Sequence, residues 1–207
     1  MKDKEIIYYK NGNIKKEIYY KNSIVHREDG PAVLWYNEDG KKIEEVYYKN
    51  NLRHKEDGPA HIRYYSNGKI KEETYYKNGE KHRKNGLAYI EYYEDGKIGC
   101  EEYWINGTRH RINGPAIISY YDNGKIYKER YYVNGKRHRE DGPAITWYYN
   151  SGNIWEEIYY VDDKLHKLDG PAIIFYNRNR MVANQKYYID GIEYDDIFQY
   201  SVMVGSI

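Results

Sequence analysis

Short runs rich in aliphatic and aromatic residues recur along the chain, and each run is bounded by turn residues. In the fourth repeat the runs are Ala116 to Tyr121 and Lys125 to Val133, separated by Asp122-Asn123-Gly124 and followed by Asn134-Gly135. Runs of about 6 to 8 residues are too short for typical helices. Asn-Gly and Asp-Gly between such runs favour hairpins, because both residues tolerate the positive φ of a type I′ turn. The pattern therefore predicts two antiparallel strands in each repeat.

The repeat has a period of 28 residues and runs through the chain without insertion or deletion. The histidines of the period are His26, His54, His82, His110, His138 and His166. The composite repeat reads approximately H-R-x-D-G-P-A-x-I-x-Y-Y-x-N-G-K-I-x-x-E-x-Y-Y-x-N-G-K-x. The stretch from His138 to Pro143 is typical of a longer return loop. Proline there marks the start of the next strand, because it cannot donate a hydrogen bond to a ladder.

These signals predict an all-β protein, an elongated single-layer antiparallel β-meander of about 14 strands made of tandem 28-residue β-hairpin repeats. Hairpin turns are predicted near Asn67-Gly68, Asp95-Gly96 and Asn123-Gly124. The alternative is a parallel β-helix with one coil per repeat. A β-helix stacks equivalent residues about 4.8 Å apart, whereas a meander separates them by about twice that distance.

The repeat array is predicted to span residues 1-188, and residues 189-207 to form a C-terminal cap. The repeat pattern dissolves in this last segment, where Tyr194 to Val202 fits either a short helix or a terminal strand. Terminal repeats usually differ from the others because an exposed sheet edge invites aggregation.

Strand parity separates an invariant face from a variable one. Ala60, Ile62 and Tyr64 recur in the later repeats, whereas the position of Arg63 is free to change. The large aromatics of the variable face are Trp35, Trp147, Phe175 and, in the strand that faces Trp147, Trp155. Tryptophan and tyrosine dominate binding hot spots, so these side chains are candidate partner-binding anchors. Packing on one another as a cross-strand cluster explains them equally well.

A row of glutamates occupies one column of the second strand. Its members are Glu45, Glu73, Glu101, Glu129 and Glu157. A row of this regularity is expected to pair with lysine or tyrosine side chains of neighbouring strands.

Composition supports a half-exposed sheet. The chain holds 29 Tyr against 2 Phe and 4 Trp, with a mean hydropathy of −1.04 and a net charge of +1. Tyrosine combines an apolar ring with a wet hydroxyl, which suits surfaces wetted on both sides. The one cysteine, Cys100, excludes an internal disulfide framework, and no leader or long apolar span is evident. A soluble intracellular protein without a transmembrane segment is therefore expected, located in the cytoplasm.

The periodic histidines do not predict a metal site or a cofactor. Equivalent histidines of successive hairpins lie about 10 Å apart, whereas donors around zinc, with bonds of about 2.0 to 2.1 Å, sit within about 4 Å of one another. We expect them instead to satisfy backbone groups of the return loops. No nucleophile elbow, phosphate loop or paired zinc-ligand motif occurs, so no catalytic residue is expected.

The return loops also carry a row of basic residues. The candidate edge for an anionic ligand consists of His26, Arg27, His82, Arg83, His110, Arg111, His138 and Arg139. Acidic residues such as Glu28 and Asp29 in the same loops cancel much of the positive field that phosphate binding requires. Nucleic acid is therefore disfavoured as a partner.

The paired aromatics, the Asn-Gly turns and the two strands per repeat resemble MORN-type repeats. The loop H-[RK]-x-[DN]-G-P-A, as in His26 to Ala32, resembles a MORN-like variant seen in giant-virus and low-GC bacterial or phage proteins. The resemblance implies a non-enzymatic protein-interaction or assembly scaffold, found in the host cytoplasm or virion if the protein is viral. The alternative is an immunity-like or sequestering binder of an anionic ligand, nucleic acid or toxin.

Overall fold

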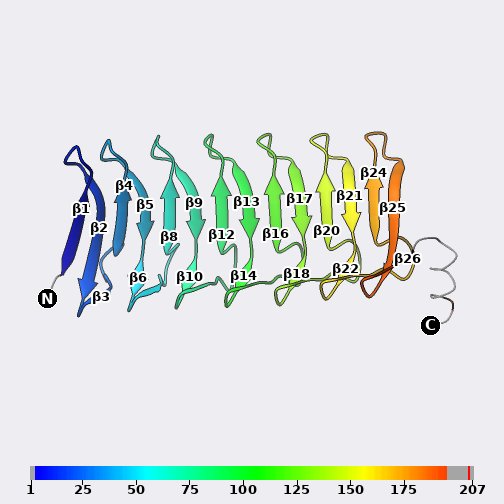
Figure 1. Cartoon of the computed structure of the whole chain (residues 1–207), viewed down its shortest axis with the longest axis horizontal. Helices are drawn as coiled ribbons and strands as arrows, with labels where there is room; N and C mark the ends of the chain where they lie inside the picture. The colour runs from blue at the N-terminus through cyan, green and yellow to red at the C-terminus, as the bar shows by residue number, and fades with distance from the viewer. Residues whose placement is uncertain (1–2, 195–204, 206–207) are drawn as a thin grey trace. The chain divides into compact units, whose positions relative to one another are not determined.

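The computed structural model describes residues 3–194 and residue 205. The chain divides into an N-terminal unit, Met1–Thr108, and a C-terminal unit, Arg109–Ile207. Within the described residues all regular structure is β-strand, and the strands form hairpins that follow one another in chain order (Figure 1).

The long strands of the N-terminal unit are β1 (Lys4–Tyr8), β2 (Ile14–Lys21), β4 (Val33–Tyr36), β5 (Lys42–Val46), β8 (His61–Tyr64), β9 (Ile70–Thr74), β12 (Tyr89–Tyr92) and β13 (Ile98–Glu102). Those of the C-terminal unit are β16 (Ile117–Tyr120), β17 (Ile126–Arg130), β20 (Ile145–Tyr148), β21 (Ile154–Ile158), β24 (Ile173–Tyr176) and β25 (Val182–Ile189), followed by β26 (Ile192–Tyr194). In each unit every strand of this series pairs with the next in antiparallel fashion. The predicted antiparallel meander is confirmed, and the parallel β-helix alternative is wrong.

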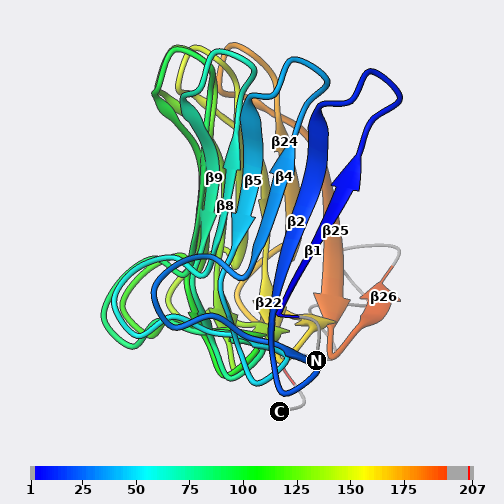
Figure 2. The ribbon, with the colours of Figure 1, turned by 90° about the vertical axis from the view of Figure 1, so that its left-hand side faces the viewer.

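Short strands lie at the ends of the long ones. They are β3 (Ile24–Val25), β6 (Tyr48–Lys49), β7 (Leu52–Arg53), β10 (Tyr76–Lys77), β11 (Glu80–Lys81), β14 (Trp104–Ile105), β15 (Thr108–Arg109), β18 (Tyr132–Val133), β19 (Lys136–Arg137), β22 (Tyr160–Val161) and β23 (Lys164–Leu165). In the N-terminal unit they and the return loops gather at one end of the long strands, opposite the hairpin turns (Figure 2).

The predicted strand from Lys125 to Val133 is wrong as a single element. It is divided into β17 and β18 by Tyr131, whose backbone is held on both sides: its N–H donates to Ala144 O at 2.8 Å, and its carbonyl accepts from His138 N at 3.3 Å. The chain therefore leaves the sheet at Tyr131, and Asn134-Gly135 closes the two-residue hairpin of β18 and β19.

The two hairpin turns of a repeat have different backbone geometry. At the Asn134-Gly135 turn both residues have positive φ, 50° and 83°, as the predicted type I′ turn requires. At the Asp122-Asn123-Gly124 turn only Gly124 has positive φ, and Gly124 N–H donates to Tyr121 O at 2.9 Å. The type I′ prediction is therefore wrong at this turn, which is a three-residue loop with glycine in the left-handed region. The predicted positions of the hairpin turns are confirmed.

An alanine column forms the tightest part of the core. Its members Ala32, Ala60, Ala88, Ala116, Ala144 and Ala172 are fully buried. Each lies where the return loop joins the sheet, and Ala60, for example, donates to Thr74 O at 3.0 Å and accepts from Tyr47 N at 2.7 Å. A larger side chain would push the loop away from the sheet, because interiors are close-packed.

The predicted C-terminal cap is described only in its first part. Residues 189–194 contain the end of β25 and all of β26, which pairs with β25. The helix-or-strand question for Tyr194 to Val202 lies outside the described residues after Tyr194.

Gly124→Ala is expected to destabilise the protein by about 1 to 2 kcal/mol, because an L-residue is strained at the φ of +82° found there. An added Cβ would meet no atom within 4 Å, so the cost comes from the backbone alone. The free energy of unfolding from urea denaturation measures it. Gly124→Asn is the control and should cost less, since asparagine tolerates the left-handed region; an equal cost for both would contradict the backbone origin.

Candidate functional site

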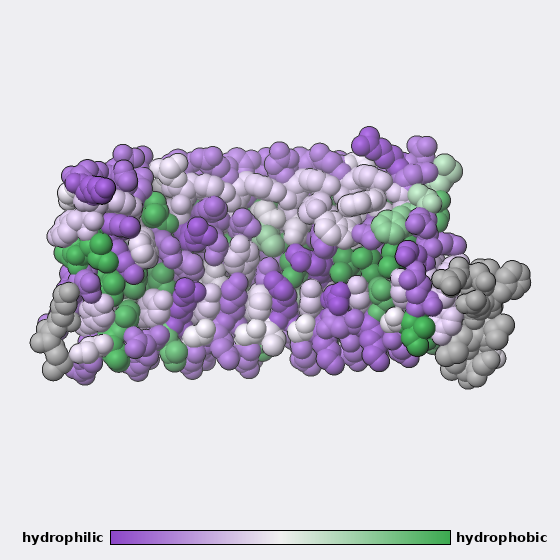
Figure 3. Space-filling model, viewed as in Figure 1, coloured by the Kyte–Doolittle hydropathy of each residue, from purple (hydrophilic) through white to green (hydrophobic). Residues whose placement is uncertain are grey.

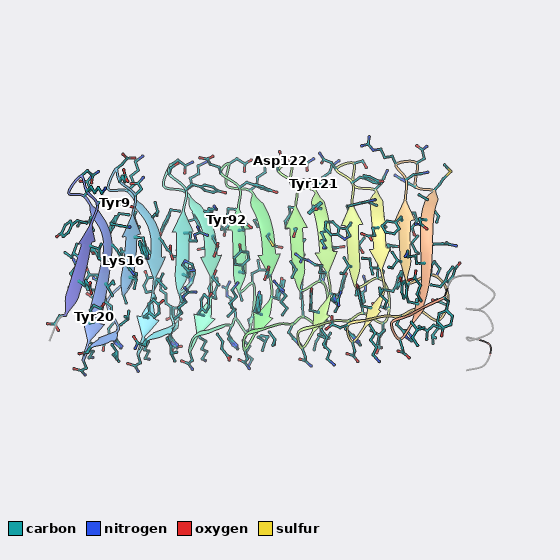
Figure 4. The ribbon with its side chains drawn as sticks, viewed as in Figure 1. Tyr9, Lys16, Tyr20, Tyr92, Tyr121 and Asp122 are labelled. Carbon is teal, nitrogen blue, oxygen red and sulfur yellow. The ribbon has the colours of Figure 1, made fainter. Side chains whose placement is uncertain are left out.

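Two of the four predicted anchors occupy the same position in a repeated cross-strand group. Trp35 on β4 lies between Lys16 on β2 and Glu44 on β5, and Lys16 Nζ is 4.3 Å from the indole centroid. Figure 4 labels Lys16 midway along β2. Such a cation over an indole face is held by the ring quadrupole.

The C-terminal unit repeats this arrangement. Trp147 on β20 lies between Lys128 on β17 and Glu156 on β21, and Lys128 Nζ is 3.5 Å from the indole centroid. We call Lys16–Trp35–Glu44 and Lys128–Trp147–Glu156 the two Lys–Trp–Glu triads. Each triad places one tryptophan between a cation and a carboxylate on the variable face.

Trp147 also belongs to an aromatic cluster. Its centroid lies 5.1 Å from that of Tyr127 and 5.7 Å from that of Trp155, and Tyr121 and Tyr149 extend the cluster at 5.0 and 6.2 Å. Three of the four contacts are edge-to-face, the arrangement that ring quadrupoles favour. Trp155 remains 39% exposed, so the cluster presents an aromatic surface to solvent.

Phe175 extends the same face by one strand. It lies on β24, with Glu156 as its partner on β21 and Asn184 as its partner on β25. Glu156 therefore stands between Trp147 and Phe175. Hydrophobic side chains gather over the strands β20 to β25 of the C-terminal unit, within a mostly hydrophilic surface (Figure 3). The structure thus brings three of the predicted anchors together and places Trp35 in the N-terminal unit.

The charges of the two triads are in different electrostatic settings. Burial, and then the like charge of Arg130, lowers the pKa of Lys128 to about 8, while Glu156 opposes this shift. Burial raises the pKa of Glu156, against the effect of Lys128. In the N-terminal unit His61 Nε2 lies 2.9 Å from Glu44 and lowers the pKa of that carboxyl, although burial opposes the shift. Burial therefore destabilises the charged form of Lys128 in the C-terminal triad.

Sequence reasoning missed Lys16, Lys128, Arg130 and Tyr127 as members of this surface. A signal was present: the column that holds Glu44, Glu72 and Glu156 has lysine at Lys16 and Lys128. A sign change in a periodic column does not reveal that the side chain lies over an indole, because that contact needs the pairing register.

The histidines of the return loops join each repeat to the next. In every case the Nδ1 atom accepts the backbone N–H of the residue 24 positions later, with N···N distances of 3.1 to 3.3 Å. The donors are the positive-φ turn residues Asn50, Asn78, Asn106, Asn134, Asp162 and Asp190. The histidines therefore satisfy backbone groups as expected, but these groups belong to the short hairpin turns and not to the return loops.

The arginines of the predicted anionic-ligand edge are engaged within their own loops. The guanidinium groups of Arg27, Arg83 and Arg139 lie 4.0 to 4.1 Å from the ring centroids of Tyr19, Tyr75 and Tyr131. Arg27 and Arg139 donate to Asp29 and Asp141 at 2.8 Å, and Arg111 donates to Pro115 O at 3.0 Å. Ion pairing with Asp29 is the main reason that the pKa of Arg27 is raised. These contacts compete with any anion for the same N–H groups.

A groove runs between the first two return loops. It has a volume of about 670 Å³ and is lined by His26, Arg27, Glu28, Asp29, Gly30, Tyr47, Tyr48, Lys49, His54, Lys55, Glu56 and Asp57. The carboxylates of Glu28 and Asp29 are 72% and 80% exposed, whereas the Arg27 side chain is only 26% exposed. The rim of the groove is therefore acidic, with the cations beneath it.

The glutamate row of the invariant face is paired as predicted. Tyrosine hydroxyls donate to Glu45, Glu73, Glu129 and Glu157 at 2.6 to 2.9 Å, each from a residue 19 positions later. Burial, and then the glutamate, raises the pKa of these tyrosines, such as Tyr64. A second ladder joins Tyr121 OH, at the turn end of β16 (Figure 4), to Tyr148 O at 2.8 Å. The tyrosine–glutamate bonds occupy the invariant face with contacts between repeats, whereas Tyr121 belongs to the aromatic cluster of the variable face.

Three comparisons with known proteins bear on this arrangement. The sequence profile described as "MORN repeat variant" matches residues 4–22, 32–50, 60–78, 117–134 and 145–162. Five segments of the chain therefore match the MORN repeat variant. No curated protein matches the chain.

Eight chains of solved structures match. One is the "Crystal Structure of TcdB2-TccC3-TEV", at 11% identity and a TM-score of 0.17, covering 92% of this chain. The chain spans 13% of that protein's length.

Over residues 3–194, no group of three or more His, Cys, Asp or Glu side chains is placed to hold a metal ion. The same part of the chain contains no helix of the length and apolarity that a membrane span requires.

Lys128→Met is expected to raise the free energy of unfolding at pH 7. The pKa of Lys128 is about 8 in the folded protein and 10.5 as a reference, so the unfolded chain binds the proton more tightly. Wild-type stability therefore rises with pH between these values, and the advantage of Lys128→Met should narrow from pH 7 to pH 9.5. Urea denaturation at both pH values measures this; a constant difference would contradict the desolvation of Lys128.

His54→Phe is expected to cost about 0.5 to 1.5 kcal/mol, because the exposed turn residue Asn78 loses the part-buried hydrogen bond from its N–H to the His54 ring. Hydrogen exchange at the Asn78 amide should accelerate more than at amides of distant repeats. Glu56→Gln is the control, because it changes only the exposed partner of His54 Nε2 and should leave the Asn78 amide protected. Unchanged exchange in His54→Phe would show that the bond is dispensable.

Proposed function

We propose that the protein is a non-enzymatic protein-interaction or assembly scaffold that binds through its variable face. Trp35, Trp147, Trp155 and Phe175 are the proposed anchors. The observation that carries the proposal is the division between the faces: ladders between repeats occupy the invariant face, whereas the variable face holds half-buried aromatics beside charged groups. Such surfaces are typical of binding hot spots.

The repeat type supports this function. MORN repeats are generally protein- or membrane-binding modules. Repeat proteins present extended surfaces in which each repeat contributes a few variable side chains. A location inside the cell remains a prediction.

The second candidate, an immunity-like or sequestering binder of an anionic ligand, nucleic acid or toxin at the His–Arg edge, is less well supported. The guanidinium groups at this edge already contact tyrosine rings and carboxylates, and the exposed rim carries Glu28 and Asp29. A nucleic acid would have to displace these partners and approach acidic groups.

The double variant Trp35→Ser with Trp147→Ser is expected to abolish partner capture or self-association while the melting temperature falls only slightly. Capture is measured by photo-crosslinking in the source cells from a benzophenone side chain at the exposed position of Asn184, the β25 partner of Phe175. Sedimentation velocity on the purified chain measures self-association.

Trp104→Ser is the matched control, because Trp104 lies in the short strand β14 and bonds Glu102 at 2.6 Å outside the variable column. It should retain the crosslinks. Unchanged crosslinks in the double variant together with a large fall in melting temperature would make the two tryptophans structural.

A further inference from the structure

Two cations on the variable face of the C-terminal unit lack acidic partners. Lys128 and Arg130 are two residues apart on β17, so their side chains share one face of the strand. Lys128 contacts the Trp147 ring, but neither residue forms an ion pair or hydrogen bond with another residue of the described chain. The Arg130 Nε atom is buried and has no hydrogen-bond partner. A buried N–H without an acceptor costs free energy, so this position is not explained by stability.

The equivalent strands of the N-terminal unit do not carry cations at both positions, and only β2 has a lysine at the first, Lys16. β9 has Glu72 and Thr74, and Glu72 lies 3.6 Å from Arg63 of the neighbouring strand. The third nearby cation of the C-terminal face, Lys186, already pairs with Glu193 at 2.9 Å. Lys128 and Arg130 are thus the unpaired cations of this face.

The surroundings of the two cations are apolar and aromatic. Arg130 lies between Ile117 and Ile145, its partners on the strands to either side, which are 0% and 7% exposed. Lys128 lies beside Trp147, and the aromatic cluster continues from Trp147 to Trp155 at the surface. An anion that reaches these cations would therefore be flanked by aromatic rings.

We propose that Lys128 and Arg130 bind a carboxylate of a partner protein segment, and that an aromatic side chain next to this carboxylate packs on Trp147 and Trp155. The inference rests on the proposed function and names the chemistry of the partner. The occupant is an acidic segment that contains an aromatic residue.

Charge complementarity favours a carboxylate over a phosphate. The groups that face the site are Lys128 and Arg130, with two positive charges, and Glu156, with one negative charge. Their sum of +1 matches a monoanion. A phosphate carries about 1.5 to 2 negative charges and would meet Glu156 beside the same tryptophan. Arginine N–H donors bind carboxylates by charge-assisted hydrogen bonds.

The test uses the full ¹⁵N-labelled chain and follows its indole N–H signals by NMR during titration. The probe is the peptide acetyl-Gly-Asp-Phe-Gly-amide, which carries one carboxylate, compared with acetyl-Gly-Asn-Phe-Gly-amide and with phenyl phosphate. We expect saturable shifts of the Trp147 and Trp155 signals with the acidic peptide and at least tenfold weaker binding of the amide peptide. Absence of saturable shifts, equal binding of the amide peptide, or tighter binding of phenyl phosphate would overturn the proposal.

The variant Lys128→Glu with Arg130→Thr gives β17 the pair that β9 already carries, so the repeat accepts both residues. It should weaken binding of the acidic peptide at least tenfold. Arg130→Gln alone is a milder variant and should weaken it in the same direction. The matched control is Lys16→Met, because Lys16 contacts Trp35 but has Ile18 in place of the second cation. Loss of binding in Lys16→Met equal to that in the β17 variants would overturn the assignment.

The experiments distinguish a failure of the carboxylate assignment from a failure of the proposed scaffold function. If crosslinks from position 184 form and depend on Trp147 but the acidic peptide does not bind, the scaffold function stands and the carboxylate assignment fails. If neither crosslinks nor self-association occur, the scaffold function itself fails.

Discussion

The hydrogen bond from each turn N–H to a histidine ring 24 residues earlier is the interaction on which the repeat depends. The type I′ turn directs the N–H of its first residue out of the sheet, where no strand can accept it. The imidazole of the preceding return loop supplies the acceptor, and the alanine column lets that loop pack closely against the sheet. An inserted or deleted residue would misplace the ring relative to the turn. This explains physically why the period of 28 residues does not vary.

This constraint separates the parts of a repeat that build the fold from those that are free for binding. Histidines, loop arginines, the glutamate row and its tyrosines contact neighbouring repeats or their own loop. Basic residues at a regular spacing therefore do not make an anion-binding edge. The positions free of these ladders lie on the variable face. A change there leaves the bonds between repeats intact, so selection for a partner can act on these positions alone.

Lys128 and Arg130 show that residues on the variable face can lower the stability of the folded protein. A lysine whose pKa is lowered by burial and an arginine with an unsatisfied Nε both reduce stability, and neither is needed by the repeat, since β9 carries Glu72 and Thr74 instead. Positions at which a protein gives up stability are typical of functional sites, where local consistency is broken for binding. In the N-terminal unit, Glu72 occupies the position equivalent to Lys128 and lies beside Arg63, so the charge at that position has a partner.

The sequence by itself determined the antiparallel meander, the positions of the turns and the pairing of the glutamate row, because periodic spacing and turn chemistry are local properties that strand pairing then repeats. It did not determine that Tyr131 divides the second strand, that the first turn is a three-residue loop, or that Lys128 lies over Trp147 with Arg130 beside it. Each of these depends on which backbone and side-chain groups of other repeats are within reach. Only the register of strands far apart in the sequence decides that, so only the tertiary structure could reveal it.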